Sequence, residues 1–115
     1  MNLLKETKEA IRDSGHKPSN IVFIGSRDGE YRCSWDEFKL LADVEYDAGF
    51  GAQEVATDLI IVFGDGQTMW RGEYDGSEWW DFSRPFKMPE SSKPIMRLTA
   101  DEGLVGWASL GEIHQ

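Results

Sequence analysis

Five consecutive apolar residues, Leu59–Phe63, form the longest uninterrupted apolar run in this chain of 115 residues. A strand with one solvated face alternates apolar and polar residues, so this run predicts a strand that is covered on both faces. Gly64-Asp65-Gly66 then predicts a turn, and the residues from Thr68 to Tyr74 predict the next strand. The run is far shorter than the ~20 residues that cross a bilayer as a helix, so it predicts no membrane segment.

A two-residue Asp75-Gly76 turn closes the predicted hairpin, because Asp-Gly favours the backbone twist that joins two antiparallel strands. In the resulting register Gly72 faces Trp79 and Arg71 faces Trp80. We therefore expect Trp79 to cover the bare strand glycine and Arg71 to stack on Trp80. Successive residues point to opposite faces, so one tryptophan faces the core and the other is partly exposed. The sequence leaves open which of the two is exposed.

The same register sets Glu73 directly opposite Glu78, with Asp75 at the tip between them. Directly opposed like charges destabilise a sheet. Three interpretations remain: a solvated tip, a site for an Arg or Lys side chain of a partner, or a divalent-cation site, which the lack of ordered acid spacing disfavours. If the carboxylates meet a partner, changing both glutamates to glutamine should weaken binding and leave the stability of the free protein unchanged or slightly higher.

Apolar spacing predicts the remaining elements, together with capping-box patterns at residues 34–37 and 99–102. They are a helix over about residues 3–14, a hairpin over 21–33, a helix from 35 to about 46, one helical turn over 53–57, a return strand over 77–82, a short edge strand over 95–98, and a short helix or loose tail over 99–115. This order predicts a single α+β domain over residues 1–115, with an antiparallel sheet of about five strands and two helices packed on one face. The expected core comprises one tryptophan face of the last hairpin together with Ile21, Phe23, Phe38, Leu41, Leu59, Ile61 and Phe63.

The negative charge of the chain is concentrated in its middle. Residues 28–81 contain 14 of the 21 acidic residues and three of the 12 basic ones, and the whole chain has a formal net charge of −9. Such a charge serves solubility, but it also suits an acidic face that attracts a basic partner. The same balance disfavours direct nucleic-acid binding, which needs a basic surface.

Three carboxylates crowd the C-terminal end of the second predicted helix, where the helix dipole disfavours negative charge by up to about 1 kcal/mol. This placement indicates that they serve something other than helix stability. We therefore predict a partner-binding surface at this helix end and the neighbouring hairpin tip, with Trp79 as the aromatic anchor. Its predicted residues are Asp43, Glu45, Asp47, Glu73, Asp75, Glu78 and Trp79.

The motifs of common enzyme classes are missing from the sequence. There is no HExxH, CxxC or phosphate-loop pattern, His114 falls in the tail, and His16 is expected to be a solvated loop residue. Cys33 is the single cysteine, so no internal disulfide forms, and we expect it to be a small buried side chain. The sequence thus predicts a non-enzyme without metal or cofactor. Its first residues lack the apolar core of a signal peptide, which predicts a cytoplasmic protein.

Three segments, residues 45–51, 58–63 and 73–80, carry a resemblance to a known group of proteins. The last of them reads Glu-Tyr-Asp-Gly-Ser-Glu-Trp-Trp, and the similarity covers roughly residues 18–88. Together they resemble a family of small uncharacterised proteins of bacteriophages and prophages. The family has no known activity, so the resemblance implies only a context, namely an accessory protein acting inside a bacterial host cell. By analogy, small acidic phage proteins often block host nucleic-acid machinery, anti-CRISPR proteins being one example.

These observations favour a non-catalytic acidic protein that binds and inhibits a basic host protein, for example a nucleic-acid-binding defence factor, in an anti-CRISPR-like manner or by imitating nucleic acid. The alternative is a small-ligand or carbohydrate-binding module, or a weak hydrolase, that uses the tryptophan and carboxylate cluster. Added salt separates the two, because it weakens attraction between opposite charges steeply and sugar stacking hardly at all. The sequence leaves the oligomeric state open.

Overall fold

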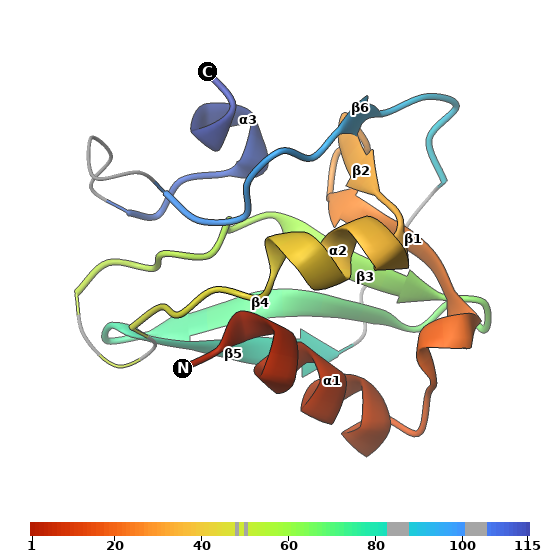
Figure 1. Cartoon of the computed structure of the whole chain (residues 1–115), viewed down its shortest axis with the longest axis horizontal. Helices are drawn as coiled ribbons and strands as arrows, with labels where there is room; N and C mark the ends of the chain where they lie inside the picture. Colours follow the sequence, from red (N-terminus) through yellow and green to blue (C-terminus); the bar gives the residue numbers. More distant parts are fainter. Residues whose placement is uncertain (48, 50, 83–87, 101–105) are drawn as a thin grey trace.

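The computed structural model describes residues 1–47, 49, 51–82, 88–100 and 106–115, and it is an α+β fold built on one six-stranded sheet (Figure 1). In chain order the elements are α1 (Leu3–Asp13), the 3₁₀ turn η1 (Pro18–Asn20), β1 (Ile21–Ser26), β2 (Tyr31–Cys33), α2 (Trp35–Leu41), β3 (Leu59–Phe63), β4 (Thr68–Tyr74), β5 (Ser77–Phe82), β6 (Lys93–Pro94) and α3 (Leu110–Ile113). No helix among the described residues is long and apolar enough to cross a membrane.

The strands lie side by side in the order β5-β4-β3-β1-β2-β6. Neighbouring strands run antiparallel except β2 and β6, which run parallel. Helices α1 and α2 lie on the same face of the sheet (Figure 1). The predicted α+β class is therefore confirmed. The sheet has six strands where about five were expected, and it is mixed, not wholly antiparallel as predicted, because the two-residue edge strand β6 pairs parallel with β2.

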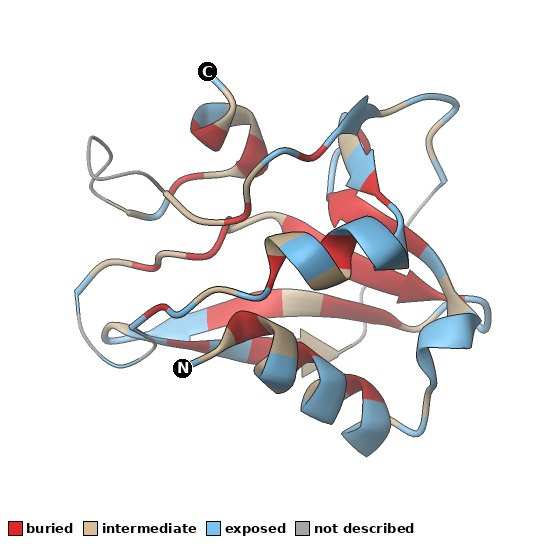
Figure 2. Cartoon of the chain, viewed as in Figure 1, coloured by how far each residue is buried: buried red, intermediate tan, exposed pale blue. Residues whose placement is uncertain are grey.

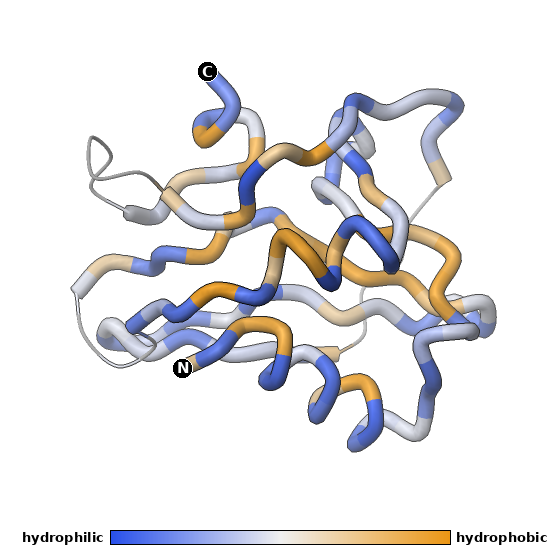
Figure 3. The backbone as a smooth tube through the Cα atoms, in the orientation of Figure 1, coloured by the Kyte–Doolittle hydropathy of each residue, from blue (hydrophilic) through white to orange (hydrophobic). Residues whose placement is uncertain are grey.

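Strand β3 lies within the sheet between β1 and β4, and all five of its residues are buried. Ile61 and its two neighbours on the same face belong to the main core, which also includes residues of α1 and α2, whereas Ile60 and Val62 cluster with Phe23 on the opposite face. The prediction of a strand covered on both faces is confirmed. Figure 2 shows buried residues along the strands behind the helices. Figure 3 shows strongly hydrophobic stretches on β1 and β3, whereas β4 and β5 are mostly pale or hydrophilic.

Most of the residues predicted for the core are buried. Those that are buried are Phe23, Phe38, Leu59, Ile61 and Phe63. Ile21 and Leu41 are only partly buried, and both pack against the main core.

Two capping patterns start the long helices where the sequence predicts. The side chain of Asn2 accepts the N–H of Lys5 at 3.0 Å and caps α1. At the start of α2, Ser34 Oγ accepts the N–H of Glu37 while the Glu37 carboxylate accepts the N–H of Ser34, which is the predicted capping box. Each bond satisfies an N–H group that the first helical turn leaves unpaired.

Helix α2 ends at Leu41, several residues before the predicted end near Tyr46. The chain leaves the helix because its next backbone groups pair with the start of α1 instead of with their own helix. The N–H of Leu3, for example, donates to the carbonyl of Val44 at 3.1 Å. Two of the three acidic residues predicted to crowd the helix end therefore lie well beyond it on an extended segment, and the helix-dipole argument for them was wrong.

Two short elements of the second half differ from the predictions. Residues 53–57 form no helical turn, because Val55 instead forms an isolated antiparallel bridge with Thr99. Residues 95–98 are not the edge strand; that place is taken by Lys93–Pro94. The chain around Leu98 instead supports residues 53–57, since the Leu98 carbonyl accepts the N–H of Ala56 at 3.1 Å.

The tail ends in the short helix α3, which agrees with one of the two predicted states of residues 99–115. Its capping box is formed by Ser109 and Glu112, whose N–H donates to Ser109 Oγ at 3.3 Å. The capping pattern noted in the sequence at residues 99–102 is a different one, and it reaches into residues 101–105, which lie outside the described part of the chain. Leu110 and Ile113 anchor α3 in the main core.

Candidate partner-binding surface

The β4–β5 hairpin has the register that the Asp75-Gly76 turn predicts. Gly72 lies opposite Trp79, and a Cβ atom added to Gly72 would lie 2.7 Å from the indole nitrogen of Trp79. Trp79 therefore covers Gly72, as expected. On the other face, the guanidinium carbon of Arg71 lies 4.9 Å from the ring centre of Trp80, so the expected stacking is also confirmed.

The two tryptophans of β5 have different environments. Trp80 faces the helices and is 7% exposed, whereas Trp79 points to the opposite face and is 37% exposed. The indole N–H of Trp80 donates to Thr7 Oγ1 at 2.9 Å, which attaches the hairpin to α1. Trp80 is thus the core tryptophan, and Trp79 is the one that a partner can reach.

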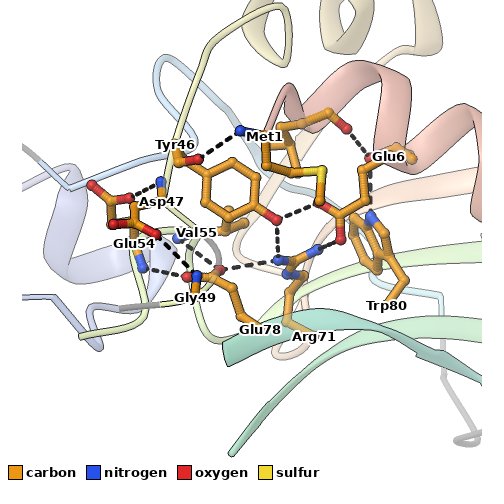
Figure 4. A network of polar contacts seen from close by, with 12 residues as sticks. Met1, Glu6, Tyr46, Asp47, Gly49, Glu54, Val55, Arg71, Glu78 and Trp80 are labelled. Carbon is orange, nitrogen blue, oxygen red and sulfur yellow. Dashed lines mark hydrogen bonds and ion pairs between the residues drawn. The ribbon is translucent and has the colours of Figure 1, made fainter. Parts of the chain in front are cut away.

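Glu78 is buried with 4% of its surface exposed, so it does not belong to an exposed surface as the sequence predicted. Its Oε1 accepts hydrogen bonds from Arg71 Nη2 at 3.0 Å and from the N–H of Val55 at 3.2 Å, and its Oε2 accepts the N–H of Glu54 at 2.8 Å (Figure 4). Burial raises the pKa of the Glu78 carboxyl group, and these donors partly offset the rise. The opposition between Glu73 and Glu78 is therefore relieved inside the protein, by Arg71.

Arg71 joins Glu78 to two further side chains, and its own side chain is 0% exposed. It donates to the carboxylate of Glu6 at 3.2 Å and to the hydroxyl oxygen of Tyr46 at 3.0 Å, and the Tyr46 hydroxyl donates to Glu6 (Figure 4). Burial is the main cause that raises the pKa of Tyr46, so the phenol stays protonated. We call Glu6, Tyr46, Arg71 and Glu78 the Arg71 cluster.

Sequence reasoning missed the Arg71 cluster, because Glu6 and Tyr46 lie 65 and 25 residues away from Arg71 in the chain. One signal was present. Strand alternation sets Arg71 on the same face as Trp80, and a basic side chain that points into a core requires a buried carboxylate as its partner. The cluster links α1, the segment after α2, β4 and β5, so it holds in place the two segments that carry the candidate surface.

The other five carboxylates of the predicted surface are all exposed. We call them the acidic surface: Asp43, Glu45, Asp47, Glu73 and Asp75. Within the described residues, none of them forms an ion pair with a Lys or Arg side chain. The Met1 ammonium group is the cation that contacts one of them, Glu45, at 3.2 Å.

Hydrogen bonds tie the two parts of the acidic surface together. The N–H of Asp47 donates to Glu54 Oε2 at 2.6 Å, and the N–H of Glu54 donates to Glu78 on the hairpin. The chain around Asp47 and the hairpin tip accordingly lie at the same end of the molecule (Figure 1). Asp43 lies farther away beside the start of α1, where Asn2 Nδ2 donates to its carboxylate at 3.0 Å.

Two exposed aromatic residues that the sequence analysis did not select lie at this end. Tyr74, next to the turn, is 76% exposed, and Trp107 is 56% exposed. The indole N–H of Trp107 donates to Glu73 Oε2 at 3.4 Å, so the residue from the tail meets the hairpin. Strand alternation could have indicated Tyr74, but nothing local in the sequence links Trp107 to a position 34 residues earlier.

A separate polar cluster surrounds His16, whose side chain is 9% exposed and not solvated as predicted. Its ring stacks on Phe63 with 4.0 Å between ring centres, Nε2 lies 2.7 Å from Asp65 Oδ2, and Nδ1 lies 2.8 Å from Ser14 Oγ. The N–H of Gln67 and then the contact with His16 lower the pKa of Asp65. Ser14, His16 and Asp65 border an open hollow of about 600 Å³, and their contacts attach the end of α1 to the turn between β3 and β4.

No protein-family model matches the chain, and neither a curated protein nor a solved structure matches it. The resemblance to bacteriophage proteins therefore stays a prediction from the sequence. Among the described residues, no three His, Cys, Asp or Glu side chains are grouped so that they could hold a metal ion.

Proposed function

We propose that the protein is a non-catalytic accessory protein that binds and inhibits a basic host protein through its acidic surface. The observation that carries this proposal is the state of the five exposed carboxylates. None of them is paired with a Lys or Arg side chain in the described part of the chain. A basic partner would therefore meet carboxylates without first displacing a competing side chain.

The overall charge supports the same proposal. With a formal net charge of −9, the protein attracts basic partners over a distance and speeds their association. Host proteins that bind nucleic acid present Lys and Arg in rows that match phosphates. Exposed carboxylates on the acidic surface can occupy those rows in place of phosphates, which gives an anti-CRISPR-like mode of inhibition. The phage resemblance adds the bacterial cytoplasm as the context.

Three exposed aromatic side chains provide apolar contact area at the hairpin, one of them against Glu73 and the other two on the opposite face of the hairpin. They belong to Tyr74, Trp79 and Trp107. Tyr and Trp are enriched among residues whose removal weakens protein–protein binding most, because they bury a large area with few rotatable bonds. An interface that combines such aromatic side chains with carboxylates gains both buried apolar area and charge complementarity.

A carbohydrate- or small-ligand-binding module is the second candidate function. Tyr74 and Trp79 favour it, because they share one face of the hairpin and are both exposed, as a platform for a sugar ring requires. Its hydrolase version is less well supported. Glycoside hydrolysis uses two available carboxyl groups, whereas Glu78, the partner of Glu73 in the register, is occupied by Arg71 in the interior.

Capture from a bacterial lysate tests the proposal, with two triple variants of equal charge. The test variant combines Asp47→Asn, Glu73→Gln and Asp75→Asn. The control variant combines Glu9→Gln, Asp13→Asn and Glu90→Gln, three exposed acids that form no ion pair among the described residues.

We expect the unmodified protein and the control to retain a basic nucleic-acid-binding protein that added salt releases, and the test variant to lose it. Equal retention by the test and control variants would contradict the proposal. Binding that resists salt and is displaced by free sugars would instead support the second candidate.

A further inference from the structure

We propose that Trp107 and Glu73 form a binding site for an arginine side chain of the partner, an inference that rests on the proposed function. It concerns one residue type and one place on the surface. Other basic contacts of the acidic surface require only charge, whereas this site combines a carboxylate with an indole ring.

Trp107 is held firmly although it is 56% exposed. Its own N–H donates to the carbonyl of Gln53 at 2.7 Å. The next residue, Ala108, is buried with 5% exposure, and its carbonyl accepts the N–H of Thr57 at 3.0 Å. Trp107 also has a φ of 55°, a backbone conformation that non-glycine residues rarely adopt. These contacts fix the backbone of Trp107, and the hydrogen bond from its indole N–H to Glu73 orients the ring on the surface.

Glu73 provides the charge next to this ring. Its Oε2 accepts the indole N–H of Trp107 at 3.4 Å, and a carboxylate has about four acceptor positions, so most of its acceptor capacity remains. Asp75, two residues along, is exposed as well and adds negative potential. In the part of the chain that the structure describes, no Lys or Arg side chain forms an ion pair with either carboxylate.

An arginine fits this combination better than a lysine does. The guanidinium group is flat, so it can stack on an indole ring while its N–H groups donate to a carboxylate in the same plane. The ammonium group of lysine is a compact, strongly hydrated charge and gains less from the ring. The Glu73 carboxylate alone would attract both arginine and lysine, and the indole ring of Trp107 is what favours arginine.

Two peptides of Gly and Ser test the site, one with several arginines and one with the same number of lysines. Binding is measured by isothermal titration calorimetry with the full chain, and by the NMR shift of the Trp107 indole N–H. We expect the arginine peptide to bind at least about threefold more tightly, which corresponds to an exposed cation–π contact, and to shift the Trp107 signal.

Trp107→Leu should bring the ratio of the two affinities close to one while both peptides still bind. Tyr74→Leu is the matched control, because Tyr74 is exposed on the same hairpin but on the face opposite to Glu73, and it should leave the ratio unchanged. Equal affinities in the unmodified protein, or a ratio that survives Trp107→Leu, would overturn the arginine site and leave the proposed function standing. Failure of both peptides to bind at low salt would count against both.

Discussion

Arg71 and Glu78 form an ion pair in the protein interior, with both side chains 0% exposed and 3.0 Å between Nη2 and Oε1. The pair joins the neighbouring strands β4 and β5, and the N–H groups of Glu54 and Val55 complete the surroundings of the carboxylate. A buried ion pair adds little over an apolar pair of the same shape, but the loss of one partner leaves a buried charge without compensation. The folded state therefore requires the hairpin to lie against residues 54–55, whose N–H groups donate to the Glu78 carboxylate.

Glu78→Gln should lower the free energy of unfolding by about 3 kcal/mol, because it takes a buried carboxylate away from Arg71. Glu73→Gln, at the directly opposite position, should change it by less than ~0.5 kcal/mol, since Glu73 is exposed. Urea unfolding followed by tryptophan fluorescence measures both. From the register alone, replacing both glutamates was expected to leave the stability unchanged or slightly higher. Because Glu78 is buried against Arg71, we now expect the double replacement to lower it. Equal stabilities of the two single variants would speak against the buried pair.

Cys33 should be almost unreactive toward iodoacetamide in the folded protein. It is 6% exposed, and burial, assisted by Glu37, raises the pKa of its thiol to about 12. The thiolate is the reactive form, and in the unfolded chain the thiol has a pKa of about 8.5. The folded pKa is the higher one, so the stability that the neutral thiol contributes is complete below the unfolded value and is lost as pH rises toward the folded value.

Mass spectrometry of the labelled protein at mildly alkaline pH, with and without urea, checks this prediction. The unfolded chain should be labelled completely while the folded chain is labelled only as fast as it opens. Rapid labelling without urea would show that the thiol of Cys33 is accessible.

The sequence was sufficient wherever a structural feature depends on residues that are close in the chain. The Asp75-Gly76 turn specifies the hairpin register, because only a few neighbouring residues determine how two strands meet. The capping box at Ser34 and Glu37 involves residues three positions apart. The continuous apolar run of β3 is equally local, and it predicted correctly that both faces of the strand are covered.

Features that depend on distant partners could not be predicted in this way. The register places Glu78 opposite Glu73, but which carboxylate enters the core depends on Arg71, Glu6 and Tyr46, which three other segments contribute. The end of α2 is set by hydrogen bonds to the start of α1. The contact between Trp107 and the hairpin likewise joins the tail to a strand far earlier in the chain. Periodicity carries no information about such pairings.

Asp65→Asn should remove a stabilising contact with His16, and the resulting loss of stability should depend on pH. The pKa of Asp65 is lowered, chiefly by the N–H of Gln67 and then by His16. A group with a lowered folded-state pKa contributes stability above its ordinary value, 3.8 here, and loses that contribution as pH falls through the folded value. The difference in melting temperature between the two proteins should therefore close in acid. Asp75→Asn, which lies at the exposed hairpin tip, serves as the control, and a difference independent of pH would show that the charge of Asp65 does not contribute to stability.

Tyr46→Phe should lower stability and loosen the segment that carries the acidic surface. The substitution keeps the ring and removes only the hydroxyl, which accepts from Arg71 at 3.0 Å and donates to Glu6. The expected loss is about 1–2 kcal/mol in urea unfolding.

When Tyr46→Phe is combined with Glu6→Gln, the total loss of stability should be smaller than the sum of the two single losses by at least ~0.5 kcal/mol, because both changes disrupt the same cluster. Hydrogen exchange of the Glu54 N–H, which donates to Glu78, should accelerate beyond the change in global stability. Tyr74→Phe, at a residue that is 76% exposed, should change none of these quantities. Strict additivity in the double variant would show that Glu6 and Tyr46 act on Arg71 independently.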